Sequence, residues 1–597
     1  MTDDADLSAA LDALAAASPS RAALAAPGRA PLSFGALVAQ RGRTTPVLRA
    51  LGIARGDVVA WCNGDRAQTA AALATLPDAC TLAPLSTSAT RGGLLDLVRR
   101  LDAKAIVVPT QRGSVAEAVA EELGVATLVA DDGARREAGA FDLVVRRRTP
   151  SLERARRWSP AWAQVSATSG STGRPKLVPQ GHRQVLRTSR MAGAAMGMGP
   201  RDASGHIMPL HLTGGMRTAF FQSLLVGGTT CVLPEADVGA LLEAIAAGDV
   251  SYVSASFAMQ RELLARLEAG ARVSRGRLRF VRVSSGRMSD DEMDRLERAL
   301  GVPVVTGLAS SETGTIAQQT LDRPRKRGSV GRALDTEIRL VDGDGRVVGT
   351  GEAGEIQVRG PQVFDGYVDD DALGAASFVD GWFRMGDLAR FDADGDLYVV
   401  GRVKDVINRG GDKIAPLEID EVLRSLPGVA DAAAFGVPHA RLGEEVVAAV
   451  VPRDDASRDP EPLLEALRER LGARRAPRQL WFVDALPRTD GGKIRRALLP
   501  GWVGYVAAGA DATPAAPAAS PIETALAALW AGVLAREDIA RDAAFADLGG
   551  DDACAVRLCA QVAAVFGVDI PAGALRGDAS TVARMARAIE ERRVDGV

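Results

Sequence analysis

Hydrophobic positions between residues 32 and 234 follow two alternating patterns. Short continuous apolar runs, such as Asp57–Trp61 and Ala105–Val108, are typical of buried strands. They alternate with stretches such as Gly93–Leu101, where the apolar residues have helical spacing. Strands that alternate with amphipathic helices predict an α/β architecture with mainly parallel sheets.

The pattern changes twice further along the chain. From Asp387 to Val400, charged, turn-forming and apolar residues alternate as in an antiparallel hairpin. The residues from Gly401 to Leu499 then predict a smaller α+β unit. Residues 507–519 are rich in alanine and proline and have no periodic apolar face, which indicates an interdomain linker.

Helical spacing returns after the linker, in Pro521–Leu534, Asp552–Phe566 and Val582–Glu590. These stretches fit a helical bundle. We therefore predict four parts, which are a large N-terminal domain over 1–400, a small α+β domain over 401–500, a linker over 501–519 and a helical domain over 520–597.

Composition narrows the class of protein. The chain has 597 residues, which is more than a single hydrophobic core of ~250–300 residues can include. Its 47% hydrophobic and 25% charged residues are ordinary values for a globular protein. A net charge of −3 gives no sign of a nucleic-acid partner. No apolar run reaches the ~18 residues that span a bilayer. The five cysteines form no CxxC pair and the N-terminus lacks a basic region, which favours a cytoplasmic protein without a membrane partner.

Residues 168–176 concentrate hydroxyl groups, glycines and cations, in the order Thr-Ser-Gly-Ser-Thr-Gly-Arg-Pro-Lys. Glycines let the backbone approach an anion closely. Hydroxyls, consecutive N–H groups and a lysine can surround phosphate oxygens. The spacing differs from that of a P-loop, GxxxxGK[ST]. By itself the segment is compatible with a phosphate site or with a polar surface loop.

Later motifs decide between these interpretations. They lie in Phe383–Asp387, Gly401–Asp405, Arg409–Ile414 and Pro487–Ile494. In this order and spacing the motifs resemble the adenylate-forming superfamily, which includes acyl-CoA synthetases, luciferases and the adenylation domains of peptide synthetases. The resemblance covers about residues 30 to 500. It implies a large multi-sheet N-terminal adenylating domain, a small mobile C-terminal domain, and the use of ATP and Mg²⁺.

The resemblance assigns phosphate and metal contacts. Glu312 corresponds to the glutamate that binds Mg²⁺, a cation that prefers carboxylate oxygen. Ser311 keeps the hydroxyl that relatives direct at the α-phosphate. Leu308 replaces the tyrosine that usually lies against adenine, and Ala309 replaces a glycine, so we expect altered adenine stacking. The phosphate loop would comprise Thr168, Ser169, Gly170, Ser171, Thr172, Gly173 and Lys176.

Four further residues follow from the same resemblance. Asp387 corresponds to the aspartate that accepts hydrogen bonds from both ribose hydroxyls, and Arg402 to a second nucleotide contact. Lys493 corresponds to the catalytic lysine, placed beside the charge that develops between the carboxylate and the α-phosphate. Lys404 lies at the hinge about which the small domain rotates between the two half-reactions. An exposed turn residue explains Lys404 equally well.

The segment Pro209–Gly215 resembles the acyl-CoA synthetase version of the acyl pocket, in which His211 would gate the site. Peptide-synthetase domains place an aspartate at the position of Leu212 to pair with the substrate ammonium. Since a buried unpaired ammonium is costly, we expect an acid other than an α-amino acid. Arg217 could bind a second carboxylate or be paired within the protein. The other candidate wall residues are Thr213, Met216, Gly307, Thr315 and Ile316.

The segment Phe545–Val556 resembles acyl and peptidyl carrier proteins, whose motif is Leu-Gly-Gly-Asp-Ser. Asp552 stands at the position of the serine that carries phosphopantetheine, and a carboxylate cannot form that phosphodiester. The domain would be a degenerate carrier, a mimic of a charged carrier with Asp552 at a helix N-terminus, or the result of an engineered serine change. In each case we expect no phosphopantetheine on this chain.

These observations predict an ATP-dependent acid:thiol ligase. The acid and ATP would give acyl-AMP and pyrophosphate, and a thiol would then displace AMP. The thiol would belong to CoA, which the acyl-CoA synthetase-like motifs favour, or to a carrier protein in trans, which the attached carrier-like domain favours and which we prefer. Catalysis that stops at acyl-AMP also fits the sequence.

A protein of another class is the main alternative. Leu308, Ala309 and Asp552 depart from the family and fit a catalytically weakened docking protein of a polyketide or nonribosomal peptide pathway. The residues that argue against this alternative are Lys176, Glu312, Asp387, Arg402 and Lys493, because a degenerate enzyme is expected to have lost some of them.

Overall fold

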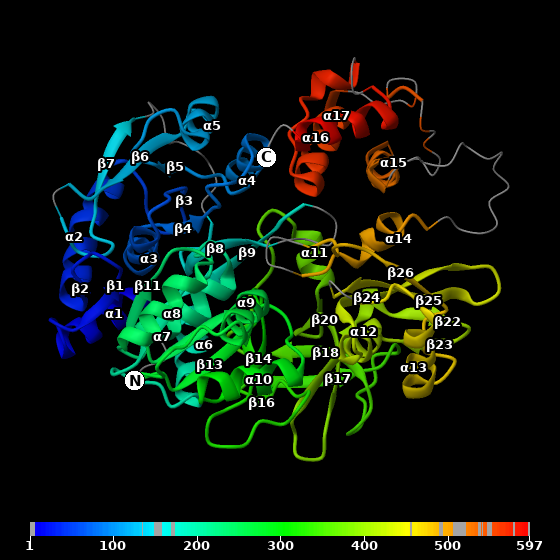
Figure 1. Ribbon diagram of the computed structural model, residues 1–597. Helices are drawn as coiled ribbons and strands as arrows, with labels where there is room; N and C mark the ends of the chain where they lie inside the picture. Colours follow the sequence, from blue (N-terminus) through cyan, green and yellow to red (C-terminus); the bar gives the residue numbers. More distant parts are fainter. Residues whose placement is uncertain are drawn as a thin grey trace. The chain divides into compact units, whose positions relative to one another are not determined.

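The computed structural model describes residues 6–133, 135–148, 158–168, 174–453, 456–488, 493–505, 521–534, 539, 541, 543–545, 548, 552–576 and 580–594. The chain forms two compact units, Met1–Val399 and Val400–Val597 (Figure 1). The first holds three sheets and the second holds a five-stranded sheet and a helical bundle.

A nine-stranded sheet forms the centre of the first unit, in the order β16-β15-β14-β13-β12-β10-β11-β1-β2. The strands from β1 to β14 in this order are parallel, whereas β2, β15 and β16 pair antiparallel. The strands are β1 (Ala22–Ala25), β2 (Leu32–Ser33), β10 (Ala203–His206), β11 (Thr229–Val232), β12 (Tyr252–Ser256), β13 (Phe280–Ser284), β14 (Val304–Ser310), β15 (Gly314–Gln318) and β16 (Arg332–Ala333).

Helices cover both faces of this sheet. On one face, apolar residues of α8 (Val238–Ala247), α9 (Phe257–Glu268) and α10 (Asp290–Leu300) share a core with Val253, Val281 and Val283. On the other face, Thr218 of the π-helix η2 (Gly215–Phe221) accepts a hydrogen bond from Ser254 of β12 at 2.9 Å. Alternate residues of β12 and β13 therefore face different layers. The remaining helices of this part are α6 (His182–Ala195) and α7 (Gln222–Leu225).

A seven-stranded sheet has the order β7-β6-β5-β3-β4-β8-β9, with parallel inner strands and antiparallel β7 and β9 at its edges. Its strands are β3 (Val58–Trp61), β4 (Thr81–Pro84), β5 (Ala105–Val108), β6 (Ala126–Asp131), β7 (Asp142–Arg147), β8 (Trp162–Thr168) and β9 (Lys176–Gly181). Its helices are α1 (Leu7–Ala17), α2 (Phe34–Ala50), α3 (Arg66–Thr75), η1 (Leu76–Asp78), α4 (Arg91–Arg100) and α5 (Val115–Leu123).

The predicted strands Asp57–Trp61 and Ala105–Val108 are β3 and β5, and the predicted helix Gly93–Leu101 is α4. The structure confirms an α/β architecture with mainly parallel sheets. Helix α4 begins at Arg91 because the Thr90 hydroxyl accepts a hydrogen bond from the backbone N–H of Gly93 at 3.2 Å.

The third sheet is antiparallel, in the order β17-β18-β20-β19 with β21 on β20. The predicted hairpin is β20 and β21, and the backbone N–H of Asp392 closes its turn on the carbonyl of Asp396 at 3.0 Å. The elements are β17 (Glu337–Val341), β18 (Gly354–Arg359), α11 (Asp371–Ala376), β19 (Phe378–Val379), β20 (Trp382–Phe391) and β21 (Leu397–Arg402).

The second unit opens with a small α+β fold. Its sheet has the order β23-β22-β25-β24, with β26 parallel to β25. Apolar residues of α12 and α13 share a core with β24 and β25. The elements are η3 (Val403–Asp405), β22 (Ile407–Arg409), β23 (Asp412–Ile414), α12 (Pro416–Ser425), β24 (Val429–His439), β25 (Gly443–Pro452), α13 (Glu461–Leu471), β26 (Gln479–Phe482), η4 (Arg496–Leu498) and α14 (Leu499–Trp502).

The C-terminal bundle consists of α15 (Pro521–Leu534), α16 (Asp552–Phe566), η5 (Ala572–Arg576) and α17 (Val582–Val594), drawn in orange to red in Figure 1. Trp530, Leu558 and Ile589, one from each α-helix, are fully buried in one core. The sequence predicted all three helices, and α17 continues four residues past the predicted Glu590. Within the described residues, no helix is both long and apolar enough to traverse a bilayer.

Candidate active site

A tight turn after β14 carries the predicted residues Ser311 and Glu312. Ser310 pairs with Gly314 across the β14–β15 hairpin, so residues 311–313 form its tip. Gly314 has φ of +68°, and a Cβ at this position would lie 2.4 Å from Cγ2 of Thr188. Only glycine therefore fits where the turn returns to the sheet.

Arg217 of η2 donates hydrogen bonds to the backbone of this turn. Its guanidinium donates to the carbonyl of Ser310 at 3.3 Å and to that of Ser311 at 3.1 Å, and the side chain is only 6% exposed. Burial lowers the pKa of Arg217 to about 10, and the charge of Glu312 opposes this shift. Of the two interpretations of Arg217, the structure shows the one in which it is paired within the protein.

A lysine, a tyrosine and a glutamate form a chain of contacts beside the turn. Lys176 Nζ donates to the Tyr367 hydroxyl at 3.3 Å, and that hydroxyl donates to Glu312 Oε1 at 3.0 Å. The ammonium also lies 4.6 Å from the centroid of the tyrosine ring. Burial and the neighbouring Glu312 raise the pKa of Tyr367, so the phenol keeps its proton and can donate it in this bond.

A second polar chain leads to Ser311. The hydroxyls of Ser311 and Thr213 lie 2.8 Å apart. Thr213 accepts from Nε2 of the buried Gln180 at 3.4 Å, so its own proton is available for Ser311. Gln180 is fixed in turn by Gln164, which donates to its amide oxygen at 2.6 Å. The structure thus joins a predicted pocket residue to a predicted phosphate contact.

The ends of the predicted phosphate loop close the β8–β9 hairpin, in which Thr168 pairs with Lys176. Residues 169–173, and with them Ser169, Gly170, Ser171, Thr172 and Gly173, lie outside the described residues. The chain leaving the loop is fixed to α4. Arg174 donates to Asp96 at 2.7 Å, and Arg100 donates to the carbonyl of Pro175 at 2.8 Å.

A β-bulge positions Asp387 on β20. Gln357 pairs with Arg384 and Glu355 pairs with Leu388, so β20 has two extra residues between these pairs. Gly386, with φ of +73°, lies in the bulge directly before Asp387, which is half-buried. Bulges re-aim side chains and are common near active sites.

The predicted acyl pocket begins where β10 leads into η2. Fully buried His206 lies with Nε2 3.0 Å from the carbonyl of Gly215 and Nδ1 3.2 Å from Arg66 Nη2. Burial lowers the pKa of His206 to about 3, so the imidazole is neutral and can bridge the two. A Cβ on Gly215 would lie 2.2 Å from the Pro209 carbonyl, which requires glycine at this entry to the helix.

The candidate wall residues of the acyl pocket differ in how exposed they are. His211, Leu212, Thr213 and Gly307 are half-buried and can present atoms to a ligand. Leu308 is half-buried and packs against the cluster that contains Ile316, Ala317 and Leu340. The fully buried candidates are Met216, Thr315 and Ile316.

The remaining predicted residues belong to the second unit. Arg402 ends β21, Lys404 lies in η3, and both side chains are exposed. Lys493 is exposed and follows residues 489–492, which are outside the described residues. Its neighbour Ile494 pairs with Arg488 in an isolated antiparallel bridge.

Sequence reasoning missed Tyr367 and Gln180. Tyr367 is one of only four tyrosines in the chain, but it contacts Glu312 across 55 positions, a pairing without a local signal. Gln180 was recognisable in principle, because it is a polar residue within the strand-like segment Lys176–Gly181.

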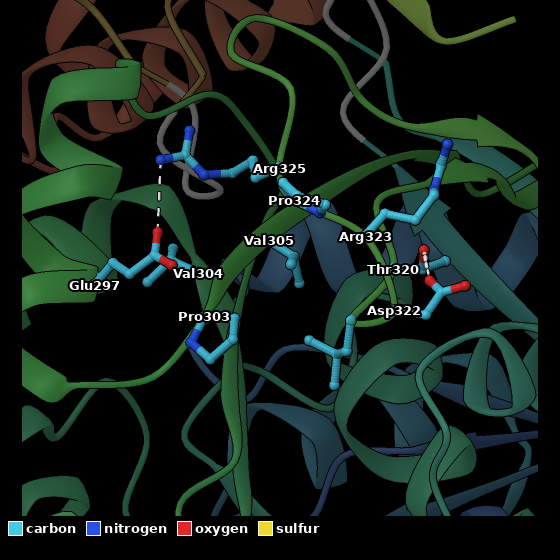
Figure 2. Close-up of a pocket in the computed structure, with 10 residues that line it drawn as sticks. Glu297, Pro303, Val304, Val305, Thr320, Asp322, Arg323, Pro324 and Arg325 are labelled. Atoms are coloured by element: carbon cyan, nitrogen blue, oxygen red, sulfur yellow. Dashed lines mark hydrogen bonds and ion pairs between the residues drawn. The ribbon is translucent and has the colours of Figure 1, made fainter. Parts of the chain in front are cut away.

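A surface cleft at the amino end of β14 is separate from these contacts (Figure 2). Its cation Arg325 lies 3.6 Å from Glu297 and 3.1 Å from Asp290, and Thr320 bonds to Asp322. None of the predicted site residues is among those that line it, which are Glu297, Pro303, Val304, Val305, Thr320, Leu321, Asp322, Arg323, Pro324 and Arg325.

The donor set fits a nucleotide-bound magnesium ion. Among the described residues no cluster of three or more metal-ligating side chains occurs. Mg²⁺ usually needs only one or two protein carboxylates when phosphates and water supply the other ligands. Glu312 would hold it, and the bound ion would offset phosphate charge.

Comparisons with known proteins identify the family of the chain. The sequence matches the AMP-binding enzyme family over residues 11–368, the AMP-binding enzyme C-terminal domain over 418–493 and the phosphopantetheine attachment site over 524–589. It is 31% identical to a probable CoA ligase, CCL9, of Humulus lupulus, over 76% of this chain and 88% of that protein.

Two further proteins are similar to this chain. One is the oxalate–CoA ligase of Arabidopsis thaliana, 32% identical over 56% of this chain and 66% of that protein. The other is the ATP-bound structure of MatB from Rhodopseudomonas palustris, with a TM-score of 0.73 and 27% identity over 83% of this chain and 98% of that one. The chain therefore belongs to the AMP-binding enzymes, the adenylate-forming superfamily, and is an acid:thiol ligase that works through an acyl-adenylate, with a carrier domain at its C-terminus.

Proposed function

We propose that this ligase activates a small carboxylic acid and passes the acyl group to the thiol of a phosphopantetheine arm outside the chain. The observation that carries the proposal is the contact chain Lys176–Tyr367–Glu312. In this chain the Tyr367 hydroxyl contacts both a cation that suits phosphate oxygens and a carboxylate that suits Mg²⁺.

The two steps divide the site residues into groups. First, a carboxylate oxygen attacks the α-phosphorus of ATP, and the bond to pyrophosphate breaks. Residues 168–176 would hold the departing phosphates, Ser311 the α-phosphate and Leu308 the adenine. Asp387 and Arg402 would hold the ribose, and Lys493 would stabilise the developing charge.

In the second step the thiol sulfur attacks the acyl carbonyl carbon. AMP leaves with the bonding electrons, and the thiol proton passes to solvent. Rotation of the small domain about Lys404 would switch the site from the first half-reaction to the second. His211 would gate the acyl pocket.

Leu212 supports an acid other than an α-amino acid. It is half-buried at the entry to η2, where an ammonium would require a carboxylate partner. The curated relatives reported above are named as CoA ligases, one of them for oxalate. We propose that the pocket, bounded by Leu212, Thr213, Gly307 and their neighbours, takes an acid of this small non-amino type.

CoA and carrier proteins present the same phosphopantetheine thiol. Names of relatives favour CoA, whereas the attached carrier domain favours a second carrier protein in trans. With Asp552 at the serine position, we propose that the acyl group does not remain on this chain.

The test supplies ATP, Mg²⁺, the acid and either CoA or a separately purified phosphopantetheinylated carrier protein. We expect one thioester per AMP and pyrophosphate released, detected by mass spectrometry. The Lys493→Ala variant and a reaction without acid are the controls. Release of ADP and phosphate in place of AMP and pyrophosphate would overturn the proposal.

A further inference from the structure

Arg282 is a buried cation in the middle of β13. It interrupts the apolar run Phe280-Val281-Arg282-Val283, and its side chain is only 2% exposed. Val281 and Val283 belong to the core beneath α8, α9 and α10. Because strand residues alternate between faces, Arg282 points to the opposite layer, where η2 lies.

Nothing in the described part of the chain neutralises this guanidinium. Its Nε and Nη1 atoms are buried without a hydrogen-bond partner, and no acidic residue of the described ranges is among the groups that shift its pKa. Burial lowers the pKa of Arg282 to about 10, and the opposing shift comes from the phenol of Tyr252. Arg282 therefore remains protonated at neutral pH, and a buried charge without a counter-ion is costly.

The guanidinium lies next to Gly307, a predicted wall residue of the acyl pocket. A Cβ on Gly307 would lie 3.3 Å from Arg282 Nη2, so glycine at this position keeps a side chain from standing between the guanidinium and the strand. Gly307 is half-buried and lies three residues before Ser310, on the strand that leads into the Ser311–Glu312 turn. On the same layer, Ser285 has the left-handed φ of +60°, and its hydroxyl lies 3.0 Å from where a Cβ of Gly214 would be.

Arg217 is also a buried arginine, but its hydrogen bonds differ from those of Arg282. Both arginines are buried and each has an Nε without a partner, but both terminal nitrogens of Arg217 donate to carbonyls of the turn, whereas Nη1 of Arg282 has no partner. Arg217 therefore has a structural task, whereas Arg282 has donors that await an acceptor. A planar guanidinium with free donors matches a carboxylate, which can accept two parallel hydrogen bonds.

We infer that Arg282 is the specificity-determining residue of the acyl pocket and binds a second carboxylate of the substrate, which is therefore a small dicarboxylic acid. This inference rests on the proposed function. One carboxylate reacts at the turn that carries Ser311, and the other pairs with Arg282. Monocarboxylic acids of equal length leave the buried cation unpaired and are rejected.

The experiment compares matched acids in acid-dependent ATP–pyrophosphate exchange. Each dicarboxylic acid from two to six carbons is paired with the monocarboxylic acid of the same length, and kcat/KM is measured for both. We expect the wild type to favour one dicarboxylic acid over its partner by at least about 100-fold, the scale for loss of a buried polar contact. Arg282→Met should lose this preference, whereas Arg282→Lys should keep part of it.

Arg279→Gln is the matched control, because Arg279 precedes β13 and pairs with Asp202 at 2.6 Å, away from the pocket wall. It should keep the preference for the dicarboxylic acid. Melting temperatures of all variants show whether they fold. If Arg282→Met does not fold, the wild-type preference and Arg282→Lys still decide the matter.

A wild type that exchanges with monocarboxylic acids as well as with their dicarboxylic partners would overturn the inference and leave the proposed function intact. A dicarboxylic preference that survives in folded Arg282→Met would do the same. Absence of exchange with every acid would instead remove the proposed function, and this inference with it.

Discussion

The predicted nucleotide contacts of the first unit and the carrier-like bundle of the second differ in what their activity depends on. In the first unit the predicted charged groups are linked, since Lys176 and Glu312 both contact the hydroxyl of Tyr367. The bundle has its own core and an ion pair between Arg541 and Glu523 at 2.9 Å, but we propose that Asp552 stands where carrier proteins have their serine. A fold depends on many apolar positions, whereas a covalent attachment depends on one hydroxyl. A domain match therefore establishes the fold of the bundle and not its activity.

Introducing a serine at position 552 gives the largest expected effect. After incubation with CoA and a phosphopantetheinyl transferase, the wild type should show no added mass, because a carboxylate cannot accept the group. Asp552→Ser should gain one phosphopantetheine if the bundle still presents the start of α16 to the transferase. Intact-protein mass spectrometry measures both.

Wild-type protein that gains the phosphopantetheine mass would contradict this comparison directly. An Asp552→Ala variant, which changes the charge without supplying a hydroxyl, is the control and should remain unmodified.

Removal of the predicted catalytic lysine comes next. Lys493→Ala should lower acid-dependent exchange at least ~100-fold, because a fixed cation beside the reacting phosphate contributes on this scale. Arg495→Ala removes another exposed cation two positions away and should have little effect. Equal losses in the two variants would show that the effect is not specific to Lys493.

The sequence predicted the elements better than the contacts. Helices α15 and α16 were predicted with their observed bounds, because helical periodicity and linker composition are local signals. The turn with Ser311 and Glu312 and the bulge at Asp387 lie on predicted motifs. The Tyr367–Glu312 bond and the layer that Arg282 faces depend on how distant strands pair, which periodicity alone does not specify.

Removing the Tyr367 hydroxyl, which lies between Lys176 and Glu312, should have a smaller effect. Tyr367→Phe removes the acceptor for Lys176 and the donor to Glu312, so we expect roughly a 10-fold loss of exchange, as for one charge-assisted hydrogen bond. Its matched control is Tyr398→Phe, which removes a hydroxyl that donates to Asp392 at 3.2 Å. A full rate in Tyr367→Phe would mean that the contact chain is not needed for catalysis.

Acid should weaken the first unit but not the bundle. Burial lowers the pKa of His182 from 6.5 to about 4 and that of His206 to about 3, so the unfolded chain binds protons more tightly. Their stabilising contribution is present above pH 6.5 and is lost as the pH falls towards 4. Between pH 7 and pH 5 we expect a loss of roughly 1–2 kcal/mol for each histidine.

Calorimetry at pH 7 and pH 5 measures this difference. The unfolding transition that ATP raises belongs to the first unit, and His182→Asn should reduce its pH dependence. The bundle, residues 521–594, contains none of the four histidines. An equal acid shift of every transition would contradict the assignment to these two residues.

Acid-dependent ATP–pyrophosphate exchange, measured across monocarboxylic, dicarboxylic, aromatic, fatty and α-amino acids, would distinguish the proposed ligase from a docking protein. We expect exchange with a small acid that is not an α-amino acid, highest for a dicarboxylic acid and lost in Lys493→Ala and Asp387→Ala. Exchange confined to α-amino acids would contradict the argument from Leu212. No exchange with any acid, together with no ATP binding by calorimetry, would contradict the whole account and favour a docking protein.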